Sequence, residues 1–204
     1  GWEGDEGRSD VKSVCGDYPA VISFDLGHIE LGDTMSLDKV PFTKIRKEIL
    51  NQYKRGGMSS LSWHLRNPLT GGDSWDVSDT TVVKSILPGG ANHEKFTGWV
   101  SKVSAFINSL QTEEGVKVPV LFRPWHEHTG SWFWWGEKLC TPEEYKALWH
   151  MTVDILRNDG VDNALYAYSP GSEPQDTAQY LKRYPGDELI DLIGFDTYQF
   201  ERDT

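Results

Sequence analysis

The sequence is short of positive charge and has no long apolar run. It has 20 Lys and Arg residues against 31 Asp and Glu residues, a formal net charge of −11 at pH 7. A surface of that sign does not neutralise phosphates or anionic lipid head groups, so we expect no nucleic-acid and no membrane partner. No apolar run approaches the roughly 20 residues that a membrane-spanning helix needs, and the first ten residues do not resemble a signal peptide.

Cysteine is also scarce, and phosphate-binding loops are missing. Cys15 and Cys140 are the only two cysteines, which allows one disulfide if the protein is exported but equally allows two free thiols. No GxGxxG or GxxxxGK[ST] pattern follows an expected strand, and no repeat or low-complexity segment occurs. We expect no cofactor.

Aromatic residues, in contrast, are abundant. The chain of 204 residues contains nine Trp, eight Tyr and eight Phe, enough to supply a sizeable core for one domain. Four consecutive aromatic residues, Trp132 to Trp135, follow a polar segment, His126 to Gly130. A surface that mixes aromatic and polar groups suits a ligand with apolar faces and hydroxyl edges, and sugars are such ligands.

Short apolar runs alternate with helical patterns along the chain. The expected helices cover Pro41 to Tyr53, the stretch around Trp99 to Leu110, Thr141 to about Gly160, and Thr177 to Tyr184, while residues 72–90 read as irregular. The expected strands are Val21 to Phe24, Met58 to Leu65, Val118 to Phe122, Ala164 to Ser169 and Leu189 to Phe195. This alternation predicts parallel βαβ units of the α/β class, either in an open doubly wound sheet or in a (β/α)8 barrel.

Polar side chains recur just after the expected strands. They are Asp25, His64, His126 with Glu127, Ser169, and Asp196 with Tyr198. Active sites of (β/α)8 barrels collect side chains from several strand ends on one face, so this recurrence favours the barrel.

Glu127 is the strongest candidate for a catalytic residue. We expect Trp125, Trp132 and Trp134 to surround its carboxyl and reduce its solvation, which favours the protonated form that a general acid needs. The plainer interpretation is an ion pair between Glu127 and Arg123.

The other polar candidates each have a structural alternative. The spacing of His126 and His128 on an extended strand places both rings on one face, but no second ligand cluster accompanies them, so we expect no metal site. His64 suits a bond to a sugar hydroxyl or a purely structural role. Arg123 is expected to orient neighbouring carboxylates or to form a simple salt bridge.

The aromatic candidates likewise have a functional and a structural interpretation. Trp132 and its neighbours suit stacking on sugar rings or a hydrophobic lid, and we expect both roles on different tryptophans. Asp196 and Tyr198 alternate, so we expect them to face the same way. Tyr198 suits the positioning of a nucleophilic carboxylate, with an ordinary core tyrosine as the alternative.

The segment Arg123 to Gly136 resembles the acid/base motif of glycoside hydrolase family 26, which consists mostly of endo-β-1,4-mannanases. The resemblance covers essentially the whole chain, and the further stretches that carry it are Ser62-Trp63-His64 with Asn67-Pro68, Tyr166-Ala167-Tyr168-Ser169-Pro170 and Gly194-Phe195-Asp196-Thr197-Tyr198. It implies a (β/α)8 barrel and a retaining mechanism. It also implies roles for individual residues: Glu127 as the acid/base, His64, His126, Trp132 and Asp196 as sugar-binding residues, Tyr198 as the partner of the nucleophile, and Trp75 as a weaker sugar-binding match.

The sequence departs from the family pattern in its strand count. In the family's clan the acid/base ends the fourth strand and the nucleophilic Glu ends the seventh. Here Glu127 follows only the third expected strand. We therefore expect residues 1–204 to form part of a single barrel domain in which the first strand and the last two strands are missing, and we name no nucleophile.

The function expected from this resemblance is endo-acting hydrolysis of β-1,4-mannosidic bonds in mannan, glucomannan or galactomannan. The alternatives are a β-1,3/1,4-glucanase or xylanase of the same family and a non-catalytic mannan-binding protein. We expect a monomer that is secreted, periplasmic or attached to the cell surface.

Overall fold

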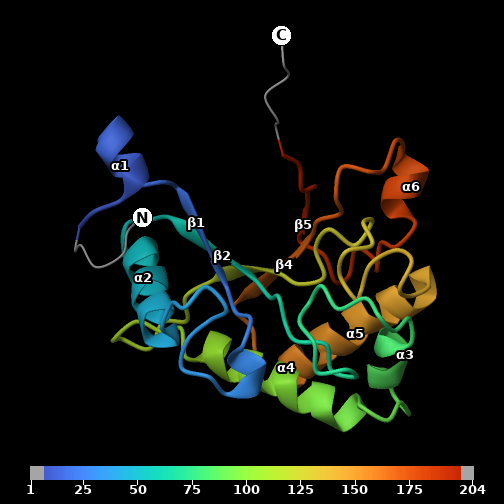
Figure 1. The fold of residues 1–204 in the computed structure, drawn as a ribbon. Helices are drawn as coiled ribbons and strands as arrows, with labels where there is room; N and C mark the ends of the chain where they lie inside the picture. Colours follow the sequence, from blue (N-terminus) through green and yellow to red (C-terminus); the bar gives the residue numbers. More distant parts are fainter. Residues whose placement is uncertain (1–6, 199–204) are drawn as a thin grey trace.

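A computed structural model describes residues 7–198 of the chain. Residues 1–6 and 199–204 lie outside this range. Five parallel strands form one sheet in the order β1-β2-β3-β4-β5 (Figure 1). Their bounds are β1 Val21–Asp25, β2 Met58–Ser62, β3 Val120–Arg123, β4 Ala164–Tyr168 and β5 Leu192–Ile193.

All five expected strands are present, but most end at different residues. β2 ends at Ser62 rather than at Leu65, and β5 has only two residues. β3 begins two residues late because the amide N–H of Val118 is already bonded to the carbonyl of Leu110 at 2.8 Å. Neighbouring strands follow each other in chain order without reversal, which excludes the doubly wound alternative within the described residues.

Among the described residues one helix precedes β1, and the others lie in the connections between the strands. The helices are α1 Asp10–Cys15, α2 Phe42–Lys54, α3 Val82–Ile86, α4 His93–Asn108, α5 Pro142–Asn158 and α6 Thr177–Leu181, with a 3-10 helix, η1, at Ile29–Leu31. The expected start of α5 is confirmed, because Thr141 and Glu144 form a reciprocal capping box around Pro142. The expectation that residues 72–90 are irregular was wrong for α3, where Val82, Val83 and Ile86 turn into the core.

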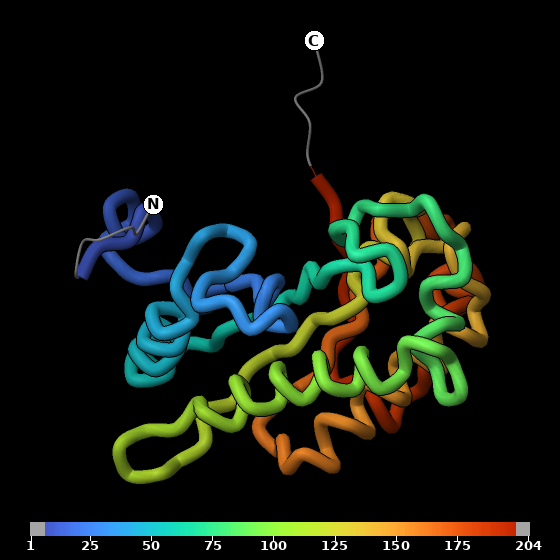
Figure 2. Tube along the Cα trace, turned by 60° about the horizontal axis from the view of Figure 1, so that its bottom comes forward, coloured from blue at the N-terminus to red at the C-terminus, as the bar shows by residue number. Residues whose placement is uncertain are grey.

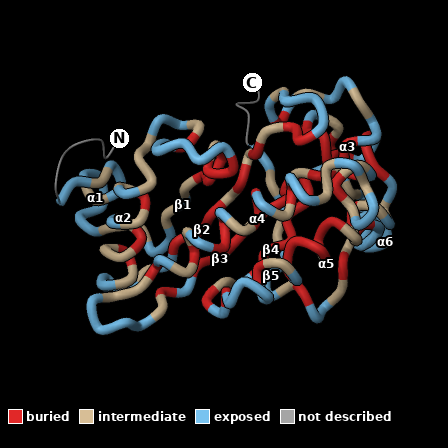
Figure 3. The backbone as a smooth tube through the Cα atoms, turned by 90° about the horizontal axis from the view of Figure 1, so that it is seen from below, coloured by how far each residue is buried: buried red, intermediate tan, exposed pale blue. Residues whose placement is uncertain are grey.

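The core lies between the sheet and the helices α4 and α5, which pack against each other along one side of it (Figures 1 and 2). Figure 3 shows much of the middle strands β2 to β4 and the inner sides of these helices as buried, whereas β5 is exposed. On α2, Ile45 and Ile49 point into this core, as their spacing predicts. None of the described helices is both long enough and apolar enough to span a membrane. Cys15 is exposed and Cys140 is buried, and both are free thiols.

Candidate active site

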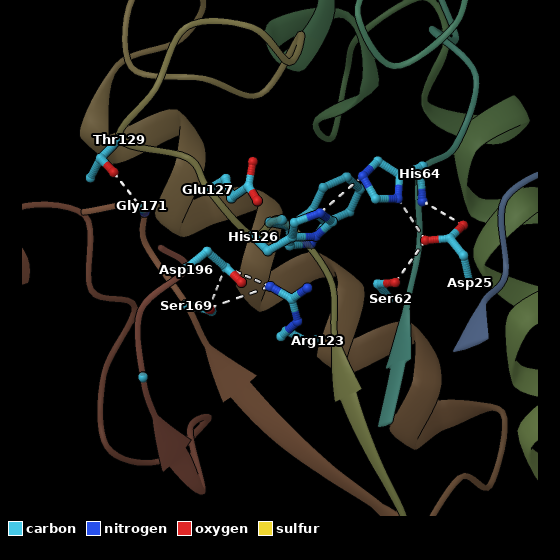
Figure 4. A network of polar contacts seen from close by, with 12 residues as sticks. Asp25, Ser62, His64, Arg123, His126, Glu127, Thr129, Ser169, Gly171 and Asp196 are labelled. Carbon is cyan, nitrogen blue, oxygen red and sulfur yellow. Dashed lines mark hydrogen bonds and ion pairs between the residues drawn. The ribbon is translucent and has the colours of Figure 1, made fainter. Parts of the chain in front are cut away.

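The polar residues expected at the strand ends lie together at the carboxyl end of the sheet. Asp25 is the last residue of β1, His64 lies two residues after β2, and Arg123 is the last residue of β3. Ser169 follows β4 directly, and Asp196 lies three residues after β5. Figure 4 shows these side chains with His126 and Glu127 at this one end, as the sequence predicts for a barrel-type site.

Asp25 is the hub of the first of two polar networks. It is 8% exposed, and its carboxylate accepts hydrogen bonds from the Gly27 amide at 2.7 Å, the Ser62 hydroxyl at 2.7 Å and the His64 amide at 3.1 Å. Nδ1 of His64 lies 2.6 Å from Oδ2 of the same carboxylate. Burial raises the pKa of Asp25, but the hydrogen bonds and the nearby His64 outweigh it and lower the pKa to about 2.

His64 connects this network to His126. The two Nε2 atoms are 3.0 Å apart, so one of them donates a proton to the other. His126 is buried, and burial together with the nearby positive charge of Arg123 lowers its pKa well below the usual value, so its ring is neutral. The other face of His64 stacks on Trp75, with ring centroids 5.3 Å apart and planes within 9°.

Arg123 organises the second network. Its Nη1 atom lies 2.6 Å from Oδ2 of Asp196, and the Ser169 hydroxyl donates to the same oxygen at 2.5 Å. This contact fits both interpretations of Arg123, as an organiser of carboxylates and as a simple salt bridge. Its ion pair is with Asp196 and not with Glu127.

Glu127 lies in a loop whose backbone is strained. Both Glu127 and Trp125 have positive φ angles, 54° and 56°, a region that few residues with a side chain adopt. The amide of Glu127 donates to the carbonyl of Ser169 at 2.7 Å, and the carbonyl of Trp125 accepts from the Tyr145 hydroxyl at 2.7 Å. These bonds to two neighbouring elements stabilise the turn that presents the Glu127 side chain.

The expected surroundings of Glu127 were wrong in part. Trp132 does contact it, since the indole Nε1–H donates to Oε2 at 2.9 Å. Trp125 and Trp134 instead are buried in the core, with ring centroids 5.6 Å apart. Both lie in the buried cluster because the loop turns at Trp125, which directs its ring back between Trp63 and Phe96.

The expectation that His126 and His128 face the same way was also wrong. Residues 125–130 form turns rather than a strand, so the alternation of an extended chain does not apply. His126 faces His64, whereas His128 is buried between Tyr145 and Tyr168, at centroid distances of 4.4 and 4.8 Å. Within residues 7–198 no group of three His, Cys, Asp or Glu side chains has the arrangement of a metal site.

The aromatic run divides as the sequence predicts. Trp132 is 40% exposed, while Phe133, Trp134 and Trp135 are buried. Trp75 is 50% exposed and reaches the same side from the long loop after β2. The two loops lie side by side in Figure 2, joined by a bond from the Trp134 amide to the Ser74 carbonyl. Trp132 and Trp75 therefore offer two accessible indole faces near the polar networks.

Tyr198 is 73% exposed within the described residues. Asp196 and Tyr198 both follow β5 rather than belonging to it, because β5 ends at Ile193. The role of Tyr198 beside a nucleophile stays a prediction.

Two positioning residues escaped the sequence analysis. Glu30 is buried and accepts from Trp63 Nε1 at 3.0 Å and from the Arg66 amide at 2.8 Å, so it holds the Trp63 side chain before His64 and the backbone after it. Burial raises the pKa of Glu30.

Arg183 is 2% exposed and donates to the carbonyls of His128, Trp135 and Cys140, three points of the loop that carries Glu127. A charged residue far along the chain gives no sequence signal for such a contact.

The chain matches the model of glycosyl hydrolase family 26 over residues 4–203. A mannan endo-1,4-beta-mannosidase of Bifidobacterium adolescentis is 38% identical over 198 residues, which are 94% of this chain and 20% of that protein. A mannan endo-1,4-beta-mannosidase of Bacillus subtilis is 27% identical over 200 residues, 92% of this chain and 52% of that protein.

A solved structure, a GH26 beta-mannanase from Bacteroides ovatus, is similar to this chain with a TM-score of 0.97 and 65% identity. The match covers 99% of this chain and 59% of that one. The chain thus spans one fifth to about three fifths of the length of these relatives. Because the family model covers nearly every residue, the chain belongs to glycosyl hydrolase family 26.

Proposed function

We propose that the protein containing this chain is an endo-acting glycoside hydrolase that cleaves β-1,4-mannosidic bonds with retention of configuration. The observation that carries the proposal is the placement of Glu127 at the carboxyl end of the parallel sheet, with its carboxylate bonded to the exposed Trp132. A carboxyl beside a flat indole face suits protonation of the oxygen that leaves a sugar ring. The relatives named as mannan endo-1,4-beta-mannosidases support the choice of sugar.

The residues around Glu127 take complementary roles in this proposal. Trp132 and Trp75 form aromatic walls against which pyranose rings stack. His64, His126 and Asp196 bond sugar hydroxyls, and Tyr198 positions the nucleophile. The nucleophile itself is a second carboxylate about 5 Å from Glu127 in the complete site, as retaining hydrolysis requires, and no residue of this chain is assigned to it.

The proposal includes a (β/α)8 barrel in which β1 to β5 are consecutive strands. Support comes from the parallel order without reversal and from the likeness to the Bacteroides ovatus structure. The chain then forms part of a single catalytic domain. We further propose that this domain is a monomer. We place it outside the cytoplasm, secreted, in the periplasm or on the cell surface, because polymeric mannan is too large to enter a cell intact.

The test of substrate class compares release of reducing sugar from mannan, glucomannan, mixed-linkage β-glucan and xylan by a complete protein that contains this chain. We expect the highest kcat/KM on the two mannose-containing polymers. Much faster hydrolysis of β-glucan or xylan would favour the glucanase or xylanase alternative. Retention on immobilised mannan without any release of sugar would favour the non-catalytic binding protein and would contradict an enzymatic role.

A further inference from the structure

The first three strand ends are connected by one line of hydrogen bonds. It runs from Asp25 on β1 to His64 after β2 and on to His126 after β3, through contacts of 2.6 Å and 3.0 Å. Figure 4 shows this line beside Glu127. The backbone carbonyl of His126 also accepts from Trp135 Nε1 at 2.9 Å, so the residue directly before Glu127 is held from two sides.

The chemistry of Asp25 determines which nitrogen of His64 carries a proton. Two backbone amides, from Gly27 and His64, and the hydroxyl of Ser62 donate to the carboxylate. A carboxylate that receives these donors is an acceptor only. At the 2.6 Å contact the proton must therefore reside on Nδ1 of His64. The low pKa of Asp25 agrees with a carboxylate that stays ionised throughout the ordinary pH range.

A proton on Nδ1 fixes the other nitrogen as well. A neutral imidazole with Nδ1–H has a lone pair on Nε2, so His64 accepts at the 3.0 Å contact and His126 donates. The buried, neutral ring of His126 has one proton to give, and this contact places it on Nε2.

We propose that Asp25 is a positioning residue that holds the proton on Nδ1 of His64 and thereby leaves the lone pair on Nε2 of His64 as the acceptor for His126. This inference rests on the proposed function for its effect on catalysis. Its structural content, the protonated nitrogen of His64, does not depend on any activity. Asp25 itself is buried, so it acts through the two histidines.

Asp25→Asn is expected to move the proton of His64 from Nδ1 to Nε2 while keeping the shape of the side chain at position 25. The amide NH₂ of asparagine, placed near Nδ1, favours a His64 tautomer with Nε2–H, which then faces the Nε2–H of His126 as a second donor. A charge-assisted hydrogen bond contributes about 1.5–3 kcal/mol, so we expect kcat/KM on mannan to fall by about 10- to 100-fold. The matched control is Asp162→Asn, which alters an exposed carboxylate paired with Lys117 far from the site.

The experiment combines activity with ¹⁵N NMR of the histidine rings. His64 resonances are assigned by comparison with His64→Gln, and thermal unfolding verifies that each variant is folded. We expect wild type and Asp162→Asn to show Nδ1–H with an unprotonated Nε2 on His64, and Asp25→Asn to show the opposite tautomer together with the loss of kcat/KM.

A wild-type His64 protonated at Nε2 at the assay pH would overturn the inference. This NMR measurement needs only the wild type, so it can be made even if Asp25→Asn does not fold. Unchanged kcat/KM in a folded Asp25→Asn variant with a switched tautomer would also overturn it. Absence of hydrolysis by the wild type, with Nδ1–H intact on His64, would instead refute the proposed function and leave the tautomer assignment standing.

Discussion

Arg183→Met tests how the loop that carries Glu127 is held in place. The guanidinium donates to the carbonyls of His128, Trp135 and Cys140 and lies over the ring of Tyr145 at 4.2 Å. Within residues 7–198 no carboxylate forms a salt bridge with it, so a buried positive charge is stabilised by carbonyl dipoles and an aromatic face.

The magnitude follows from opposing contributions. Three buried carbonyls lose a donor in Arg183→Met, at about 1–3 kcal/mol each, while removal of an unpaired buried charge returns part of that cost. We expect the free energy of unfolding to fall by about 3 kcal/mol. We also expect kcat on mannan to fall, because one of the freed carbonyls belongs to His128, the residue next to Glu127.

The assay is equilibrium unfolding in urea, followed by tryptophan fluorescence, together with initial rates on mannan. The neighbouring Lys182 offers a matched control, since its ion pair with Glu137 is exposed on both sides and Lys182→Met should change stability by less than about 1 kcal/mol. Equal stability and equal kcat for Arg183→Met and Lys182→Met would refute the reasoning.

Two further predictions concern pH and the aromatic wall. The pKa of Asp25 is about 2 in the folded protein against an ordinary 3.8, so its contribution to stability is complete above about pH 4 and is lost as the pH falls toward 2. Asp25→Asn should remove about 2 kcal/mol of that pH dependence, measured by urea unfolding across this range. An unchanged slope would contradict the ionised, hydrogen-bonded state of Asp25. Trp132→Phe keeps a ring face but removes the donor to Glu127, so kcat on mannan should fall roughly fivefold with little change in KM. Trp132→Ala removes the ring face as well and should also raise KM. Equal KM values for the two variants would argue against stacking on Trp132.

The sequence predicts those parts of the fold that depend on local patterns. The capping box at Thr141, the apolar stripe of α2 and the five strands all follow from residues close together in the chain. The strand ends that collect polar residues were likewise predictable, because parallel strands direct their carboxyl ends to one edge of a sheet.

Contacts between distant residues were not predictable in the same way. The positive φ angles at Trp125 and Glu127 turn the chain away from the extended form. Trp134 is buried against Trp125 while Trp132 is exposed, a split that depends on tertiary packing. The bond from Arg183 to the His128 carbonyl spans 55 residues. No pattern within one segment specifies such a contact, since it depends on how α6 and the loop pack together.

The central claim is that Glu127 protonates the leaving oxygen in the first step and activates water in the second. The most direct measurement is Glu127→Ala in a complete protein that contains this chain, assayed on mannan and on an aryl mannoside whose leaving group needs no proton. We predict a loss of about 10²- to 10⁴-fold on mannan, since a positioned acid of this kind contributes that much, while the first step on the aryl mannoside is largely spared. Equal losses on both substrates would contradict an acid role for Glu127.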